Sequence, residues 1–224
     1  MMSRMIKYSF LLIQSHPATI NAYCGRFWND TEENMEQLTG NEEFTLHGSA
    51  TGLTVQDFWR WAYSDLIDNT QRGVMAEFLV YSSLRSTPPT QMRENWVPYD
   101  VTSPSGRRIE VKSAAYIQAW TPENIFAQIR FDIGKKLAWD NETASYSSEA
   151  KRNCDLYVFC LFTAMTKDIS LLDLDYWDFY VLPTSVLNEK VPDQKGIALS
   201  SLLKLGPVKT DYAGLGSVIE SIKL

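Results

Sequence analysis

A short turn between two strand-like segments restricts the fold of this chain more than any other feature. Ser103-Pro104-Ser105-Gly106 separates YDVT from RRIEVKS. Proline suits the second position of a type I turn, and glycine suits the left-handed position that follows such a turn. The sequence therefore predicts a β-hairpin with a three-residue loop and a bulge at Gly106. In this register Ser103 pairs with Arg107, and Asp100 lies opposite Glu110.

The second strand of this hairpin carries charge along one face. Side chains alternate between the two faces of a strand, so Arg108, Glu110 and Lys112 share one face. Ile109 and Val111 share the other face, which can enter a hydrophobic core. Charged residues in the middle of a strand with this β-propensity indicate a functional site. The alternative interpretation is a structural ion pair between Glu110 and Lys112 at a solvated edge of the sheet.

Two carboxylates meet across the predicted hairpin. Cross-strand partners have Cβ atoms about 5 Å apart, so Asp100 and Glu110 repel each other unless a cation neutralises them. Mg²⁺ in proteins uses one or two carboxylates together with waters and substrate phosphates. The hairpin thus predicts a Mg²⁺ site, which Mn²⁺ could also occupy, with Lys112 beside a metal-bound water.

A third carboxylate lies on the helix that we predict over residues 71–84. Val74, Glu77, Phe78 and Tyr81 follow the i, i+3, i+4, i+7 spacing of one helix face. Glu77 is therefore expected to face the core, where a carboxylate needs a partner. We expect it to bind a second metal ion or to hold the water of the first.

This ordered set resembles the PD-(D/E)XK nuclease superfamily, which has the restriction-endonuclease-like fold. The matching residues are Glu77, Asp100, Glu110, Val111 and Lys112. The resemblance covers residues 70–120 and extends to about Pro183; Tyr99 stands where the motif has proline. It implies a metal-dependent endonuclease that hydrolyses phosphodiester bonds in nucleic acid, with DNA as the expected substrate. Asp100, Glu110 and the Val111 carbonyl would bind the metal, and Glu77 would assist them.

Four further residues are candidates for substrate binding. Tyr116 and Gln118 share the face of Glu110 if the strand continues without a bulge, and Gln118 matches a glutamine found in some branches of the superfamily. Arg72 and Arg108 lie close to the motif in the sequence and could contact phosphates, or could belong to a scattered solvated surface. A symmetric dimer would suit cleavage of both strands of a duplex.

A second function remains open beside the endonuclease. The same fold could serve as a catalytically inactive module that binds nucleic acid or another protein. The net charge of -6 favours this alternative slightly, because a general DNA-coating protein is expected to be basic. DNA or RNA, duplex or single strand, and sequence specificity are all left open.

The expected fold is an α/β (α+β) domain with a mixed sheet and an αβββαβ core. We expect an N-terminal helical extension over residues 1–53 and a nuclease-like domain over residues 54–224. A helix that begins at Thr54 carries an apolar stripe, including Phe58 and Trp59, that should be buried. Later elements are strands at 125–133, 156–162 and 176–182, a helix or loop at 134–152, a helix capped by Thr184, a helix at 200–205 and an amphipathic segment after Gly216.

The cysteines and the hydropathy pattern indicate the compartment. Cys24, Cys154 and Cys160 have neither metal-ligand spacing nor a disulfide pattern, and the last two lie in an apolar run that predicts buried thiols. No apolar stretch is long enough to span a membrane. We therefore expect a cytoplasmic protein that does not bind membranes.

Overall fold

The predicted hairpin forms in the structure, a computed structural model that describes residues 37–85, 92–93, 97–122, 124–140 and 143–224. Its strands are β3 (Val101–Thr102) and β4 (Arg108–Ala115), and Val101 pairs with Ile109. The Ser103 amide donates to the Arg107 carbonyl at 2.9 Å, and the Gly106 amide donates to the Ser103 carbonyl at 2.9 Å. The three-residue loop and its register are thus confirmed.

Gly106 has a φ of 85°, a left-handed conformation that side chains with a Cβ atom adopt at a cost. A Cβ atom added there would meet no other atom within 4 Å, so only backbone strain opposes a substitution. We expect Gly106→Ala to lower the free energy of unfolding by about 1–2 kcal/mol and Gly106→Asn by less. Urea denaturation followed by circular dichroism measures both, and equal losses for the two variants would contradict the strain argument.

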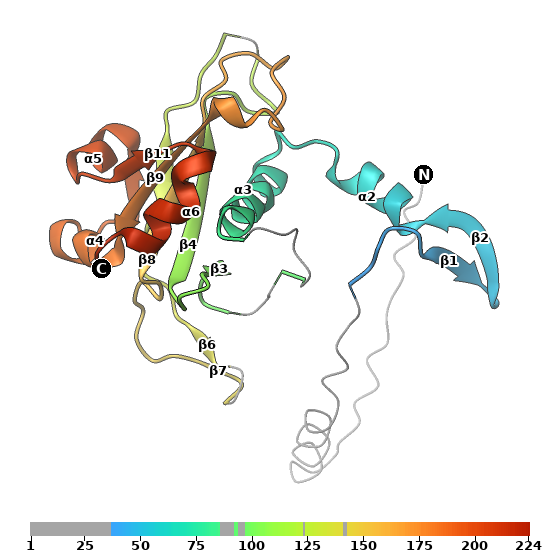
Figure 1. Cartoon of the computed structure of the whole chain (residues 1–224), viewed down its shortest axis with the longest axis horizontal. Helices are drawn as coiled ribbons and strands as arrows, with labels where there is room; N and C mark the ends of the chain where they lie inside the picture. Colours follow the sequence, from blue (N-terminus) through green and yellow to red (C-terminus); the bar gives the residue numbers. More distant parts are fainter. Residues whose placement is uncertain (1–36, 86–91, 94–96, 123, 141–142) are drawn as a thin grey trace, which may run out of the picture. The chain divides into compact units, whose positions relative to one another are not determined.

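The hairpin forms one edge of a five-stranded mixed sheet with the order β11-β9-β8-β4-β3. The other strands are β8 (Leu156–Phe162), β9 (Trp177–Pro183) and β11 (Val208–Thr210). β4 and β8 are parallel, and the remaining neighbours are antiparallel. All seven residues of β8 are buried, which agrees with the predicted apolar strand at 156–162. The mixed sheet and the α+β class are therefore confirmed (Figure 1).

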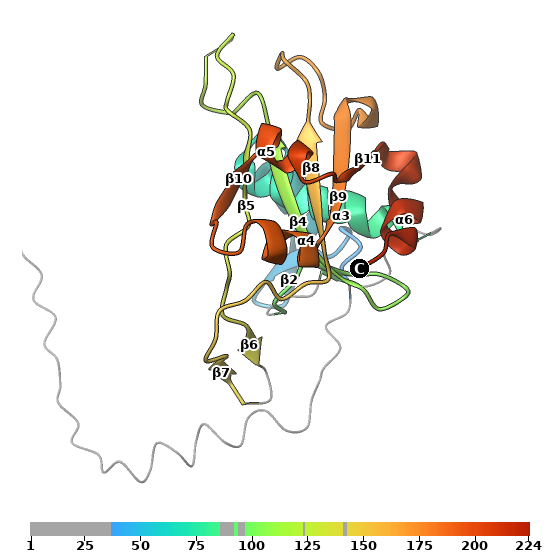
Figure 2. The ribbon, with the colours of Figure 1, turned by 90° about the vertical axis from the view of Figure 1, so that its left-hand side faces the viewer.

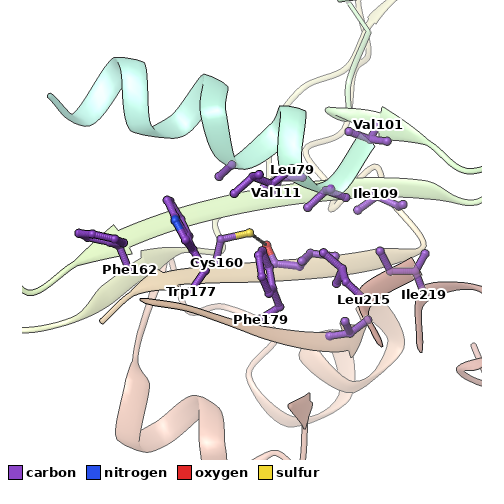
Figure 3. Packing of buried hydrophobic residues seen from close by; sticks show 14 of the residues in the cluster. Leu79, Val101, Ile109, Val111, Cys160, Phe162, Trp177, Phe179, Leu215 and Ile219 are labelled. Atoms are coloured by element: carbon purple, nitrogen blue, oxygen red, sulfur yellow. Dashed lines mark hydrogen bonds between the residues drawn. The ribbon is translucent and has the colours of Figure 1, made fainter. Parts of the chain in front are cut away.

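Two helices cover one face of this sheet, α3 (Asn69–Ser83) and α6 (Tyr212–Ser221). Ile109 and Val111 of β4 face this layer, as their alternation predicts. Figure 3 shows Leu79 of α3 and Leu215 of α6 among the side chains packed on the same face. One core therefore fixes α3, which carries Glu77, and β4, which carries Glu110 and Lys112.

The opposite face of the sheet is covered by short elements. These are β5 (Arg130–Asp132), β10 (Gly196–Ala198), α4 (Thr184–Lys190) and α5 (Leu199–Lys204) (Figure 2). β5 pairs only with β10 among the described strands. Ala114 of β4 packs in this second core, so Lys112 and Glu110, two and four residues before it, point to the same face.

Three expectations about the later elements were wrong. The strand predicted at 125–133 is ordered as β5 only at Arg130–Asp132, and it does not join the five-stranded sheet. The described residues between β4 and β8 contain β6 (Trp139–Asp140) and β7 (Ser145–Tyr146) but no helix, so the αβββαβ order is not reproduced there. Thr184 is the first residue of α4, whose cap position is Pro183. A 3-10 turn at Leu174–Tyr176 precedes β9.

The helix predicted from Thr54 is α2 (Val55–Tyr63), and a capping box between Thr54 and Asp57 begins it. Its apolar stripe was expected to be buried, yet α2 contains no buried residue, and Trp61 is 85% exposed. Residues 43–53, predicted as part of a helical extension, belong instead to a hairpin of β1 (Glu43–Leu46) and β2 (Ser49–Thr54). These elements belong to the unit Gln37–Leu224; the boundary after residue 53 stays a prediction, and residues 1–36 lie outside the described part.

Cys154 and Cys160 are buried free thiols, as predicted, while Cys24 lies outside the described residues. Burial raises the pKa of the Cys154 thiol to about 11. A buried, protonated thiol is a poor nucleophile, so neither packing nor acidity assigns Cys154 a chemical role. Within the described part of the chain, no helix combines the length and the apolar character that crossing a membrane requires.

Candidate functional site

Asp100 lies at the sheet edge, directly before β3. Its amide donates to the Ile109 carbonyl at 2.9 Å, and its Oδ2 accepts from the Val111 amide at 2.7 Å. The carboxylate therefore takes the place that a strand carbonyl would have beside β4. The N–H and C=O of one strand residue point toward the same neighbouring strand, so the Val111 carbonyl faces the same edge as Asp100.

The Asp100 carboxyl group lies in an electrostatically unfavourable position. Burial, followed by the charge of Glu110, raises its pKa from 3.8 to about 6, and Glu77 adds to the effect. The Val111 amide and Lys112 oppose the rise. Both of the other predicted carboxylates therefore act on Asp100, even though the three residues come from different parts of the chain.

Glu110 is buried, with 8% of its surface exposed, and two lysines neutralise it. Lys112 Nζ lies 2.6 Å from Glu110 Oε1, and Lys136 Nζ lies 3.2 Å from the same oxygen. Burial alone would lower the pKa of Lys136, but the charge and hydrogen bond of Glu110 raise it. The ion pair between Glu110 and Lys112, our alternative interpretation of this strand, is thus present as part of a larger cluster.

Lys136 was not among the predicted site residues. It follows β5 on the crossover between β4 and β8, twenty-six positions after Glu110. Its backbone is held by a bridge to Lys151 and by Asn153, whose Nδ2 donates to the Lys136 carbonyl at 3.1 Å. A basic residue just beyond a strand-like segment was the only signal in the sequence, and it did not indicate the contact.

Glu77 lies on α3, but its helix face does not point into the core as predicted. Ala76, Leu79 and Val80 form the buried face, whereas Val74 and Phe78 are 40% and 51% exposed. The correction has a simple cause: two apolar stripes run along α3, and the sheet covers the other one. Glu77 pairs with Arg93, whose Nη2 donates to Oε1 at 3.0 Å and whose Nε bonds Oε2.

The stripe of Glu77 borders a cavity of about 400 Å³ between α3 and β3. Apolar and aromatic side chains form much of its wall, and Glu77, Arg93 and Asp100 also line it. Among the described residues, the lining consists of Gln37, Val74, Glu77, Phe78, Tyr81, Arg85, Met92, Arg93, Asp100, Val101 and Thr102. Its size falls within the range of small-molecule sites, and two of the predicted carboxylates lie at its surface.

The two predicted substrate arginines have partners within the chain. Arg72 is buried and ties α3 to β4: its Nε donates to Ser113 Oγ at 3.2 Å and its Nη1 to the Ile67 carbonyl at 2.9 Å. Arg108 forms a two-point pair with Asp155, at 3.1 and 2.6 Å. Both guanidinium groups hold the fold around the site, and neither borders the cavity.

Tyr116 and Gln118 lie beyond the end of β4, which stops at Ala115. The strand from Glu110 to Ala115 spans about 16 Å at the usual rise per residue, so the structure separates both side chains from the carboxylates. Gln118 Nε2 donates to the Ala115 carbonyl at 2.8 Å, while its buried Oε1 has no hydrogen-bond partner among the described residues. The structure thus groups Glu77, Asp100, Glu110 and Lys112, but not these two residues.

The donor chemistry of the group suits Mg²⁺, because carboxylates and one backbone carbonyl supply only oxygen. Among the described residues, however, no three Asp, Glu, His or Cys side chains converge on one point that could hold a metal ion. Asp100, Glu110 and the Val111 carbonyl form the fragment that fits, since Mg²⁺ commonly takes two protein carboxylates and completes its shell with water and phosphate oxygens.

Comparisons of this chain with models of known protein families and with curated proteins found no match. The function of this chain is therefore inferred from the geometry of Asp100, Glu110 and Lys112 and from the cavity that Asp100 borders.

Proposed function

We propose that this protein is a metal-dependent endonuclease of the PD-(D/E)XK type that hydrolyses phosphodiester bonds in nucleic acid, with DNA as the expected substrate. One observation carries the proposal: the Asp100 carboxylate bonds the Val111 amide at 2.7 Å, between Glu110 and Lys112. Two carboxylates, a backbone carbonyl and a lysine thus meet at one sheet edge, where burial and the charge of Glu110 disfavour ionised Asp100 and raise its pKa to about 6.

The residues of the site have different roles in the proposed reaction. When bound by Asp100, Glu110 and the Val111 carbonyl, Mg²⁺ supplies a water of lowered pKa and neutralises charge on the scissile phosphate. Lys112 would donate a hydrogen bond from its ammonium group to the attacking water, which it would orient, or to a phosphate oxygen, where it would stabilise developing negative charge. Lys136 Nζ lies 3.2 Å from Glu110 Oε1, so a positive charge would remain beside this carboxylate if Lys112 exchanged Glu110 for the substrate.

The net charge of -6 does not exclude this activity, because the basic groups act locally. Lys112 and Lys136 pair with Glu110, and Arg93 pairs with Glu77. Phosphate oxygens can replace these carboxylates as partners, since charge-assisted hydrogen bonds from lysine and arginine suit phosphate equally well. We therefore expect metal and nucleic acid to strengthen each other's binding.

Calorimetric titration of Mg²⁺ and Mn²⁺ tests the metal site. The titrations use the natural protein, Asp100→Ala and the control Asp193→Ala, each with and without a short DNA strand. Asp193 is a suitable control because its side chain is 92% exposed and pairs only loosely with Lys135. We expect metal binding to be strongest with DNA and to disappear in Asp100→Ala alone.

Metal binding that is unchanged in Asp100→Ala would contradict the proposal. A screen for cleavage of single-stranded and duplex DNA and RNA, in Mg²⁺ and in Mn²⁺, follows the titration. Products that form in the natural protein and not in Asp100→Ala would establish the reaction and its substrate together.

A catalytically inactive binding module is the second candidate function, and the ion pairs favour it. Glu110 is neutralised by Lys112 and Lys136, and Glu77 is neutralised by Arg93. A protein that had lost its metal could keep such a cluster for stability. Failure of the natural protein to bind metal even with DNA present, together with no cleavage of any nucleic acid, would support the module.

A further inference from the structure

We infer that the cavity between α3 and β3 binds an unpaired nucleobase of the nucleic acid strand, so that the substrate is single-stranded, mismatched or frayed next to the bond that is cut. This inference rests on the proposed function for its position relative to cleavage. The binding of the base itself depends only on the cavity.

The apolar wall of the cavity has the character of a stacking site. Phe78 is 51% exposed, and Val74 and Met92 are 40% and 45% exposed, yet all three line the same cavity. Single exposed apolar side chains are common on protein surfaces, but three that converge on a cavity of about 400 Å³ form a binding wall. The Phe78 ring can stack on any base, because every base has a π-face.

One face of the second ring in the wall is already covered. The Arg85 guanidinium lies 3.6 Å from the centre of the Tyr81 ring and donates to the carbonyls of Tyr81 and Thr102. This arrangement holds Tyr81 in place and fixes that side of the cavity. Phe78 is therefore the aromatic side chain that we assign to the base.

The polar part of the lining selects the chemical class of the ligand. Glu77 and Asp100 place carboxylate oxygens in the wall, and Arg93, which pairs with Glu77, places a guanidinium group there. A purely apolar ligand would remove these charged groups from water, which is costly, and an anionic ligand would meet two carboxylates. A neutral, flat ring with donors and acceptors on its edge satisfies both conditions, and a nucleobase is such a ring.

The position of Asp100 determines which nucleotide can place its base in the cavity. Asp100 lines the cavity and also bonds the Val111 amide between Glu110 and Lys112. A base in the cavity therefore belongs to a nucleotide close to the scissile phosphate. Bases in a duplex are paired and stacked, and extruding one is least costly where the strand is single or mismatched.

Fluorescence anisotropy of a labelled strand of about 12 thymidines, within the usual range of single-strand sites, tests the inference. The protein is measured in EDTA and, on the Lys112→Ala background, in Mg²⁺. We expect Phe78→Ala to weaken binding about tenfold, which corresponds to the loss of one base–aromatic stack, and Phe78→Trp to preserve it. The matched control is Phe126→Ala, which removes a phenylalanine that is 44% exposed and does not line the cavity.

We also expect a thymidine–adenosine duplex of the same length to bind more weakly than the single strand, with an affinity that does not depend on Phe78. Equal losses of affinity in Phe78→Ala and Phe126→Ala would overturn the inference. So would a strand that does not bind the unmutated protein in either buffer. Duplex binding that depends on Phe78 as strongly as single-strand binding does would also overturn it. Phe78-dependent binding of thymidine monophosphate but not of the strand would assign the cavity to a free nucleotide instead. A strand that binds through Phe78 without ever being cut would keep this inference and refute the proposed catalysis.

Discussion

Replacing Lys112 with alanine is expected to lower the rate of nucleic acid cleavage about 10²- to 10³-fold, the usual cost of removing one donor that stabilises developing charge. The fold should be preserved, because Lys136 still lies 3.2 Å from Glu110 Oε1 and keeps a positive charge beside that buried carboxylate. Single-turnover cleavage measures the rate, and thermal unfolding followed by circular dichroism measures stability.

Lys190→Ala is a closely matched control for this experiment. Lys190 Nζ lies 2.6 Å from Glu189 Oε1, the same distance that separates Lys112 Nζ from Glu110 Oε1, but the Lys190 pair is exposed on α4. A general effect of losing one lysine–glutamate pair would appear in both variants. Cleavage that survives in Lys112→Ala at the level of Lys190→Ala would remove Lys112 from the mechanism.

Replacing Asp100 with asparagine is expected to abolish cleavage and, in the absence of metal, to make the protein more stable above pH 6. Burial and the charges of Glu110 and Glu77 raise the pKa of Asp100 from 3.8 to about 6. The folded protein therefore holds the proton more tightly than the unfolded chain does. Between about pH 4 and pH 6 the natural protein loses stability as the pH rises, and above pH 6 the full cost of the ionised carboxylate remains.

The size of this cost follows from the change in pKa and amounts to about 3 kcal/mol at neutral pH. Asparagine carries no charge and can still accept the hydrogen bond from the Val111 amide through its Oδ1. The gain in unfolding free energy of Asp100→Asn should therefore approach that value at pH 7.5 and should be close to zero near pH 4.

Urea denaturation in EDTA at pH 4, 5, 6 and 7.5 measures the gain, with Asp193→Asn as the exposed control. A variant that is less stable than the natural protein at pH 7.5 would show that Asp100 has a structural role that outweighs its charge. That outcome would favour the inactive module, because a carboxylate kept at a cost to stability is expected of a functional site.

The amino-acid sequence by itself determined the hairpin at the centre of the site. Turn chemistry at Gly106 and the alternation along β4 act over a few neighbouring residues, so they fix the register that sets Asp100 opposite Glu110. The same local rules predicted helix α3 to within two residues at its N-terminal end, and the continuous apolar run of β8 predicted a buried strand.

Only the tertiary structure decided what covers each apolar face and what neutralises each charge. Periodicity shows that a helix has an apolar stripe, but not whether a sheet, a cavity or solvent lies against it, which is why the stripes of α2 and of Glu77 were assigned wrongly. The pairing of β5 with β10 joins segments more than sixty residues apart in the chain. Likewise Arg93 pairs with Glu77 and Lys136 pairs with Glu110 across 16 and 26 positions of the chain, and no local preference of the backbone encodes such contacts.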